Sequence, residues 1–204
     1  MQSFSEIDTT SKRASKAAGF AWGIAEEVGK NMRNLEMFGL PGVKNLNLYF
    51  QKIKENPTEK PKKIEKENKP QEKEFCPIHC GTIFLDNCKV LESLKTIKFK
   101  NVSYPLLFLP FISRASEIVG KKISVQYEEN NFLLNFDKTI FSKNIKNNEV
   151  VSLAKEVYIE FLENSNSFSI QEWKELYKLS EKTFVEETES SKKVGAGAGL
   201  TDND

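Results

Sequence analysis

Residues 121–141, "KKISVQYEENNFLLNFDKTIF", decide the fold class. Ile123, Val125 and Tyr127 alternate with polar residues, and Phe132, Leu134 and Phe136 alternate in the same way after the polar stretch 128–131. A period of two residues places the apolar side chains on one face of a strand. Two such segments joined by a short polar turn predict a β-hairpin and therefore an antiparallel sheet.

The segments around this hairpin add strands and helices. Residues 96–102 alternate like a strand, whereas residues 150–162 fit the period of a strand and that of a helix, and we interpret them as a strand. The apolar run 104–120 leads into a helical turn that stops at Gly120. Ser169 stands three residues before Glu172, the spacing of a capping box that starts a late helix. Residues 75–190 are therefore predicted to be an α+β domain.

The first 55 residues predict a helical lobe. Ser3 and Glu6 have capping-box spacing, and apolar residues recur every three or four positions over residues 21–38 and again over 43–53. The second of these helices has apolar residues on more than one side. Three short helices cannot cover that surface by themselves, so we expect the lobe to pack on the α+β domain.

A charged segment separates the two parts. Residues 54–74 contain seven lysines, six glutamates and three prolines but one large apolar residue, Ile64. A segment of this composition has little to bury, which predicts that residues 56–74 are a flexible, solvated linker. The two signs of charge nearly cancel, which argues against a basic arm that binds nucleic acid.

Charge and composition also restrict the partners. Thirty basic and 29 acidic residues leave a net charge of +1, which gives no field to attract nucleic acid or an anionic membrane. The start of the chain lacks the pattern of a signal peptide, and no apolar stretch approaches the length of a membrane span. We therefore predict a cytoplasmic protein. Three cysteines, an odd number, are expected to be reduced thiols.

The candidate catalytic residues lie in "FCPIHCGTIFLDNC", residues 75–88, which holds the one histidine and all three cysteines. Cys76 is predicted to cap a helix that begins at Pro77, where the helix dipole would lower the thiol pKa and His79 could accept its proton. The competing interpretation, which we favour, is that the cysteines pack as small apolar side chains. Zinc bound by all four of these side chains is a further alternative, but adjacent His79 and Cys80 approach one ion awkwardly. We predict no cofactor, with zinc or another divalent cation left as an alternative.

Two other segments supply candidate binding residues. Trp22, Glu26 and Glu27 lie on the second helix, and Gly29 in the same helix predicts the close approach of another backbone, either from the α+β domain or from a second subunit. The chain ends in "GAGAGLTDND", where small residues precede an acidic tip that suits a hard cation or an arginine of a partner. We predict that residues 191–204 form an ordered binding arm, with a disordered tail as the alternative. Its binding residues are Gly195, Gly197, Gly199, Thr201, Asp202, Asn203 and Asp204.

Three parts of the sequence together resemble a bacterial family of small proteins known only as a domain of unknown function. They are "GFAWGIAEEVGK" with "FGLPG", then "FCPIHCG", and finally "GAGAGLTDND". The resemblance covers nearly the whole chain except the charged segment, and it implies no activity, cofactor or catalytic residue. His79, Cys80 and Cys88 have no place in the family pattern. The matching positions are Gly19, Gly23, Ala25, Glu26, Glu27, Gly39, Pro41, Gly42, Cys76, Pro77, Gly81 and residues 195–204.

Two functions follow as hypotheses. With one histidine and no phosphate-binding motif, the sequence favours an accessory or regulatory factor that binds another protein, or a second copy of itself, through the C-terminal arm. The alternative is a small enzyme with Cys76 as its nucleophile. The sequence leaves open whether the protein is an enzyme.

Overall fold

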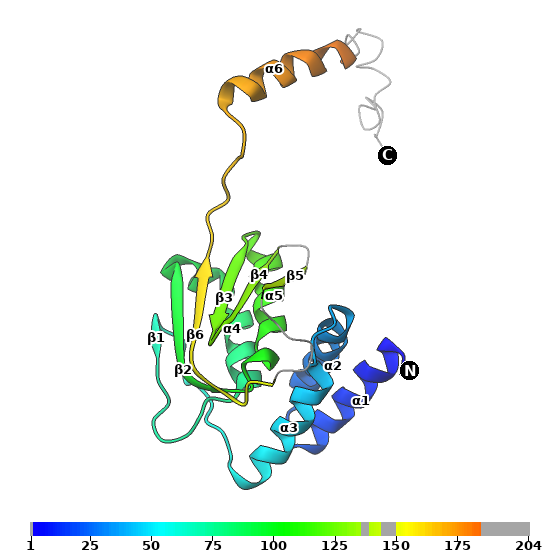
Figure 1. Ribbon diagram of the computed structural model, residues 1–204, viewed down its shortest axis with the longest axis vertical. Helices are drawn as coiled ribbons and strands as arrows, with labels where there is room; N and C mark the ends of the chain where they lie inside the picture. The colour runs from blue at the N-terminus through cyan, green and yellow to red at the C-terminus, as the bar shows by residue number, and fades with distance from the viewer. Residues whose placement is uncertain (1, 136–138, 144–149, 185–204) are drawn as a thin grey trace, which may run out of the picture. The chain divides into compact units, whose positions relative to one another are not determined.

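The computed structural model describes residues 2–135, 139–143 and 150–184. Residues 1–164 form one compact unit and residues 165–204 form a second. The fold is α+β, as the sequence predicts (Figure 1). The helices of the first unit are α1 (Phe4–Ala17), α2 (Trp22–Met37), α3 (Gly42–Glu55), α4 (Pro77–Leu91) and α5 (Leu109–Val119), with short 3-10 turns η1 (Glu92–Leu94) and η2 (Pro105–Leu107).

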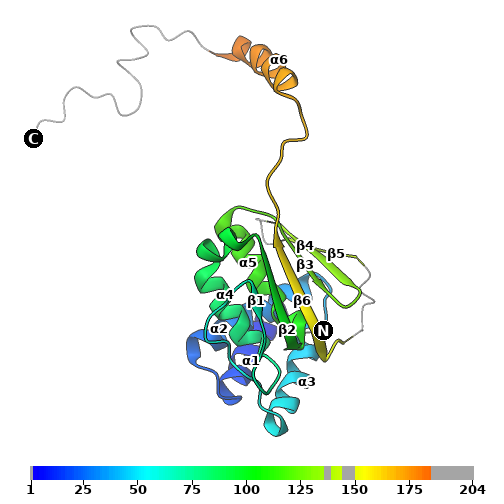
Figure 2. The ribbon, with the colours of Figure 1, turned by 90° about the vertical axis from the view of Figure 1, so that its left-hand side faces the viewer.

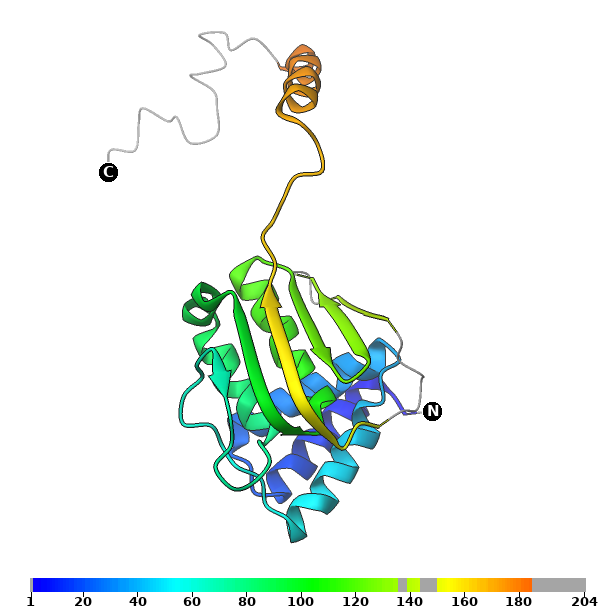
Figure 3. The same cartoon turned by 60° about the vertical axis from the view of Figure 1, so that its left-hand side comes forward.

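The strands of the first unit form one mixed sheet, ordered β1-β2-β6-β3-β4-β5 within the described residues. β1 runs parallel to β2, and the other neighbours are antiparallel. β6, the last of the described strands, inserts between β2 and β3 (Figure 3). The strands are β1 (Glu67–Asn68), β2 (Thr96–Ser103), β3 (Ile123–Tyr127), β4 (Asn130–Leu134), β5 (Ile140–Lys143) and β6 (Leu153–Phe161).

The hairpin that decides the fold class is confirmed over residues 123–134, whereas Phe136 lies outside the described residues. β3 and β4 pair antiparallel from Ile123 opposite Leu134 to Tyr127 opposite Asn130. The ambiguous segment is also a strand as interpreted: β6 pairs with β2 on one side and with β3 on the other. A central strand has ladder partners along both edges, so tertiary pairing outweighs a sequence pattern that fits a helix equally well.

The sheet buries one face. Ile97 and Phe99 of β2, Val157 and Ile159 of β6 and Val125 of β3 are all buried, while the residues between them are at least partly exposed. Helices α4 and α5 lie against the buried face, and no described helix of the first unit covers the other (Figures 2 and 3). On that open face Lys100 of β2 pairs with Glu156 of β6, directly across the strands.

The N-terminal helices pack on the outer side of the α4 and α5 layer. The predicted capping box of α1 is present, with Ser3 and Glu6 each accepting a backbone hydrogen bond from the other residue. After α2, Gly39 adopts a left-handed φ of 69° that lets the chain turn before α3. α2 contacts both α4 and α5, and buried residues of α2 belong to the same core as those of the sheet. The helical lobe therefore packs on the α+β part, as expected.

Gly29 of α2 allows the predicted close approach of a backbone. A Cβ built on Gly29 would lie 2.7 Å from the backbone oxygen of Asp8. The approaching backbone belongs to α1, its neighbour within the helical lobe, and neither to the α+β part nor to a second subunit. Consecutive helices joined by a short turn pack along their length, which brings this contact within one chain segment.

The charged segment 56–74 differs from the predicted flexible linker, because it lies inside the compact unit. It contributes β1 to the sheet edge and buries Pro61, Asn68 and Pro70. The Asn68 amide accepts a hydrogen bond from Glu65 N and donates to the carbonyl oxygens of Glu65 and Lys98. Backbone and side-chain hydrogen bonds thus hold a segment whose apolar content predicts disorder. The separate domains predicted for residues 1–55 and 75–190 are corrected to one unit that ends at Asn164.

The second unit contains α6 (Ile170–Ser180) followed by the 3-10 turn η3 (Glu181–Thr183). The capping box of Ser169 and Glu172 is present as predicted. Every described residue of this unit is exposed. The late helix, predicted as part of the α+β domain, therefore belongs to a different unit.

Candidate functional site: a cysteine at the start of α4

Cys76 occupies the predicted N-cap of α4, with Pro77 as the first helical residue. Its Sγ accepts a hydrogen bond from the backbone N–H of His79. The backbone on either side of the thiol is fixed, because Cys76 N donates to Glu59 O and Phe75 N donates to Asn101 O. The charged segment 56–74 and strand β2 therefore position the cysteine together.

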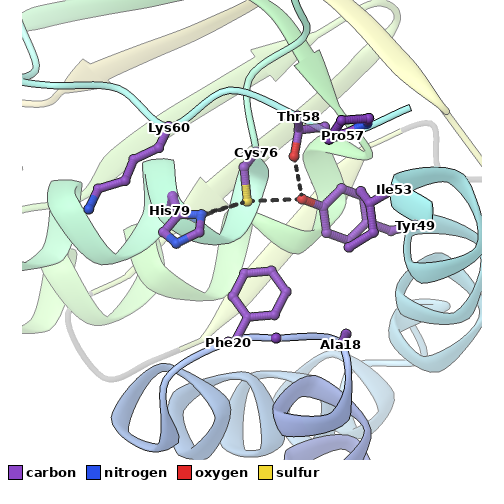
Figure 4. A pocket seen from close by; sticks show the side chains of 10 residues that line it. Ala18, Phe20, Tyr49, Ile53, Pro57, Thr58, Lys60, Cys76 and His79 are labelled. Carbon is purple, nitrogen blue, oxygen red and sulfur yellow. Dashed lines mark hydrogen bonds between the residues drawn. The ribbon is translucent and has the colours of Figure 1, made fainter. Parts of the chain in front are cut away.

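A pocket of about 280 Å³ opens beside this thiol. Its walls come from four segments: the α1–α2 turn, helix α3, the segment after α3 and the start of α4 (Figure 4). The turn supplies Phe20, whose ring centroid lies 5.3 Å from that of His79. Helix α3 supplies Tyr49 and Ile53, and the segment after it supplies Pro57, Thr58 and Lys60.

Two side chains lie within hydrogen-bond distance of the Cys76 sulfur, and a third lies within hydrogen-bond distance of one of these two. The Tyr49 hydroxyl donates to Sγ at 2.9 Å, and Nδ1 of His79 lies 3.2 Å from Sγ on the opposite side (Figure 4). The Thr58 hydroxyl lies 2.9 Å from the Tyr49 oxygen. Because Tyr49 gives its single proton to sulfur, Thr58 donates to Tyr49. A series of hydrogen bonds therefore runs from Thr58 through Tyr49 to Cys76 and on to His79.

Burial sets the resting charges of this group. Cys76 is 2% exposed, and desolvation raises the pKa of its thiol, although the hydrogen bonds from Tyr49 and from backbone amides oppose that rise. Desolvation, with the nearby positive charge of Lys60, lowers the pKa of His79. Desolvation also raises the pKa of Tyr49. At neutral pH the pair is therefore a thiol beside a neutral imidazole. The lowered thiol pKa that the nucleophile interpretation implied is wrong, because burial outweighs the helix N-terminus.

This arrangement can still produce a thiolate when a reaction demands it. Neutral His79 accepts the S–H proton at Nδ1, and the resulting thiolate keeps two donors, the Tyr49 hydroxyl and the His79 backbone N–H. Hydrogen bonds to an anion are stronger than those to a neutral thiol. The site therefore favours proton transfer as the transition state develops charge, and it keeps the cysteine protonated at rest.

The other two cysteines are buried and take no part in this group. Cys80 is fully buried, and burial together with the nearby Cys76 raises its pKa well above its ordinary value. Cys88 is also buried, three turns along α4 from the pocket. In the part of the chain that the structure describes, no three His, Cys, Asp or Glu side chains come together to hold a metal ion. Cys76, His79, Cys80 and Cys88, the alternative zinc ligands, are thus not assembled as a metal centre.

The remaining predicted binding residues lie elsewhere. Trp22 is 56% exposed, with Lys16 Nζ 5.6 Å from its ring centroid, and Glu26 pairs with Lys12 at the surface. Glu27 pairs with Arg114 of α5 and with Lys30, so it helps to join the helical lobe to α5. The arm residues Gly195, Gly197, Gly199, Thr201, Asp202, Asn203 and Asp204 lie outside the described residues.

Sequence reasoning missed Phe20, Tyr49, Thr58 and Lys60 as residues of the site. Tyr49 and Phe20 look like ordinary apolar positions of a helix and a turn, and Thr58 and Lys60 lie in a segment predicted to be disordered. Each comes from a part of the chain that the sequence assigns to the lobe or to the linker. No signal in the sequence pairs these residues with Cys76, because their proximity depends on packing between segments.

The fold and the site define an α+β protein with a protonated cysteine at a helix start facing a pocket. Residues 2–74 match the family model described as "Protein of unknown function (DUF3726)". This agrees with the resemblance to a family known only as a domain of unknown function. The matched range contributes Phe20, Tyr49, Thr58 and Lys60 to the pocket, whereas Cys76 and His79 follow it directly.

No curated protein and no protein of solved structure matches the chain. None of the helices in the described ranges has the length and apolar character needed to cross a membrane.

Proposed function

We propose that this chain is a thiol-dependent enzyme that takes an acyl group from its substrate onto Cys76. One observation carries the proposal: Cys76 Sγ lies at a pocket wall between the Tyr49 hydroxyl at 2.9 Å and His79 Nδ1 at 3.2 Å. A nucleophile within hydrogen-bond reach of a base is the geometric signature of covalent catalysis. A packing role alone would not require a polar network that faces a pocket.

The covalent step follows from these contacts. His79 Nδ1 takes the S–H proton while sulfur attacks the carbonyl carbon of the substrate, and the carbonyl electron pair moves onto oxygen. The Tyr49 hydroxyl, released from sulfur, donates to this oxyanion. When the carbonyl re-forms, the bond to the leaving group breaks, and the leaving group takes the proton from His79. A thioester on Cys76 remains for transfer to water or to another acceptor.

A test uses p-nitrophenyl acetate as an activated ester. We expect a burst of one p-nitrophenolate per chain and a single acetyl group on Cys76, located by mass spectrometry of peptides. Cys76→Ala should abolish the burst, whereas Cys88→Ala, the same replacement at a similarly buried cysteine of α4, should retain it. An acetyl group on another residue, or an unchanged burst in Cys76→Ala, would contradict the proposal.

A second candidate function is binding to another protein through the C-terminal segment. The supporting observation is that α6 exposes a cluster of large apolar side chains on a helix held by a capping box. Helices of this length are marginal in water, and an apolar face at helical spacing suits a groove of a partner protein. The exposed apolar residues are Phe168, Ile170, Trp173, Leu176, Tyr177, Leu179 and Phe184.

This second function predicts face-specific crosslinking in cells. A photoreactive amino acid in place of Trp173 should give one discrete adduct with a different protein, whereas the same group in place of the neighbouring polar Lys174 should give at least tenfold less. Residues adjacent in a helix point about 100° apart, so the two positions sample different faces. Equal yields at both positions, or adducts formed with the chain itself, would contradict binding of another protein by the apolar face.

A further inference from the structure

A second hollow shares two lining residues with the Cys76 pocket. This hollow has a volume of about 550 Å³ and is lined by residues of the α1–α2 turn, α2, α4 and α5. Lys60 and His79 line both spaces. Figure 4 shows Lys60 extending beside His79, with Tyr49 and Thr58 on the far side of Cys76.

Lys60 gives the Cys76 pocket a net positive charge. Within the described part of the chain Lys60 forms no ion pair and no side-chain hydrogen bond, and it is exposed. The other lining groups are uncharged at neutral pH, since the pKa of Cys76 is raised and that of His79 is lowered. A single cation without a counter-charge attracts an anion to this pocket.

The second hollow differs in its charge. Arg114 pairs there with Glu27, and exposed Asp86 lines the same space. Glu27 and Asp86 balance Arg114 and Lys60 in this hollow, whereas Lys60 has no counter-charge among the residues that line the Cys76 pocket, so the Cys76 pocket is the more favourable place for an anion. The ammonium group of Lys60 is a compact charge, unlike the planar guanidinium of arginine, which binds two oxygens at once. The nearby backbone N–H groups of Cys76 and His79 already donate to Glu59 O and to Cys76 Sγ, respectively. One point-like cation suits a singly charged carboxylate.

We propose that the pocket takes a small organic carboxylate whose electrophilic carbon reaches Cys76 Sγ while its carboxylate lies beside Lys60. This inference rests on the proposed thiol chemistry and names its substrate class. A volume of about 280 Å³ accepts a small metabolite-sized molecule but not a peptide chain. The bound anion also offsets the repulsion between Lys60 and the imidazolium that forms during catalysis.

The first test compares iodoacetate with iodoacetamide, which differ in the carboxylate. Sulfur displaces iodide from either reagent, a C–S bond forms, and the thiol proton passes to the buffer. Rates at Cys76 are measured by peptide mass spectrometry on the full chain. We expect Lys60→Gln to lower the iodoacetate-to-iodoacetamide rate ratio about fivefold, less so at 1 M salt. Lys62→Gln, an equal change of charge two residues away at a different hollow, should leave the ratio unchanged.

An independent arm uses His79, the one histidine of the chain, whose imidazole NMR signals are therefore unique. Acetate at constant ionic strength should raise the His79 pKa in the wild type and in Lys62→Gln but not in Lys60→Gln. An unchanged alkylation ratio in Lys60→Gln, or an equal acetate effect in both variants, overturns the carboxylate site. If neither reagent labels Cys76 but the acetate shift appears, the carboxylate site stands and the acyl chemistry fails.

Discussion

Replacing Gly81 with alanine is expected to lower the free energy of unfolding by about 3 kcal/mol. Gly81 lies on α4, one turn after Cys76, and faces α5. A Cβ built there would lie 2.2 Å from Cδ2 and 2.5 Å from Cγ of Phe111. Phe111 is only 1% exposed, so its ring has no free space to enter. Overpacking therefore exceeds the gain of about 1 kcal/mol that alanine brings to a helix.

Urea unfolding followed by circular dichroism measures this effect, and Gly23→Ala provides the matched control. Gly23 also lies in a helix, but a Cβ built on it meets nothing within 4 Å. We expect Gly23→Ala to be neutral or to stabilise by up to about 1 kcal/mol. Equal stability changes at the two positions would refute the steric explanation.

A double-mutant cycle tests the contact itself. Phe111→Ala removes the ring that a side chain at position 81 would strike, at a cost of its own. In that background Gly81→Ala should cost at least about 2 kcal/mol less than in the wild type. Additive effects would place the strain of Gly81→Ala elsewhere.

Replacing His79 with asparagine is expected to slow acetylation of Cys76 about 100-fold at pH 7. Asparagine places an oxygen near the position of Nδ1 and can accept the S–H hydrogen bond, but it cannot take the proton. The nucleophile must then come from ionisation of a thiol whose pKa burial raises. Stopped-flow measurement of p-nitrophenolate release gives the rate.

The pH dependence separates this role from a structural one. The pKa of His79 is lowered, so the imidazole is a neutral base from below its usual pKa of about 6.5 upward, and the wild-type rate should be flat across neutral pH. In His79→Asn the rate should rise about tenfold per pH unit until the thiol ionises. A flat profile in the variant, or a rate within threefold of the wild type, would remove His79 as the base. Unchanged alkylation of Cys88 checks that α4 stays folded.

The elements of this fold follow from local patterns. Alternation over residues 123–134 predicts the hairpin, and the capping boxes at Ser3 and Ser169 predict where two helices begin. Cys76 followed by Pro77 predicts the start of α4. Each signal depends on neighbours within a few residues, which interact in the same way before and after folding.

The charged segment shows where local patterns are insufficient. Composition predicts that residues 56–74 stay solvated, yet Asn68 hydrogen-bonds to β2 and Glu59 pairs with Phe75 through the backbone. The free energy that orders this segment comes from partners distant in the sequence. A prediction of disorder from composition considers only the content of apolar side chains. It does not include the backbone hydrogen bonds that a segment can form with the edge of an existing sheet.

The candidate site likewise has some features that the local sequence predicts and others that depend on tertiary packing. The sequence by itself determined the α+β class, the N-cap position of Cys76 and the proximity of His79 one helical turn later. Only the tertiary structure decided that Tyr49 and Thr58 complete the network, that Lys60 lies beside it, and that burial raises the thiol pKa. A cap depends on the backbone of a few consecutive residues, whereas desolvation depends on every segment packed around the sulfur. That packing is set by the whole chain.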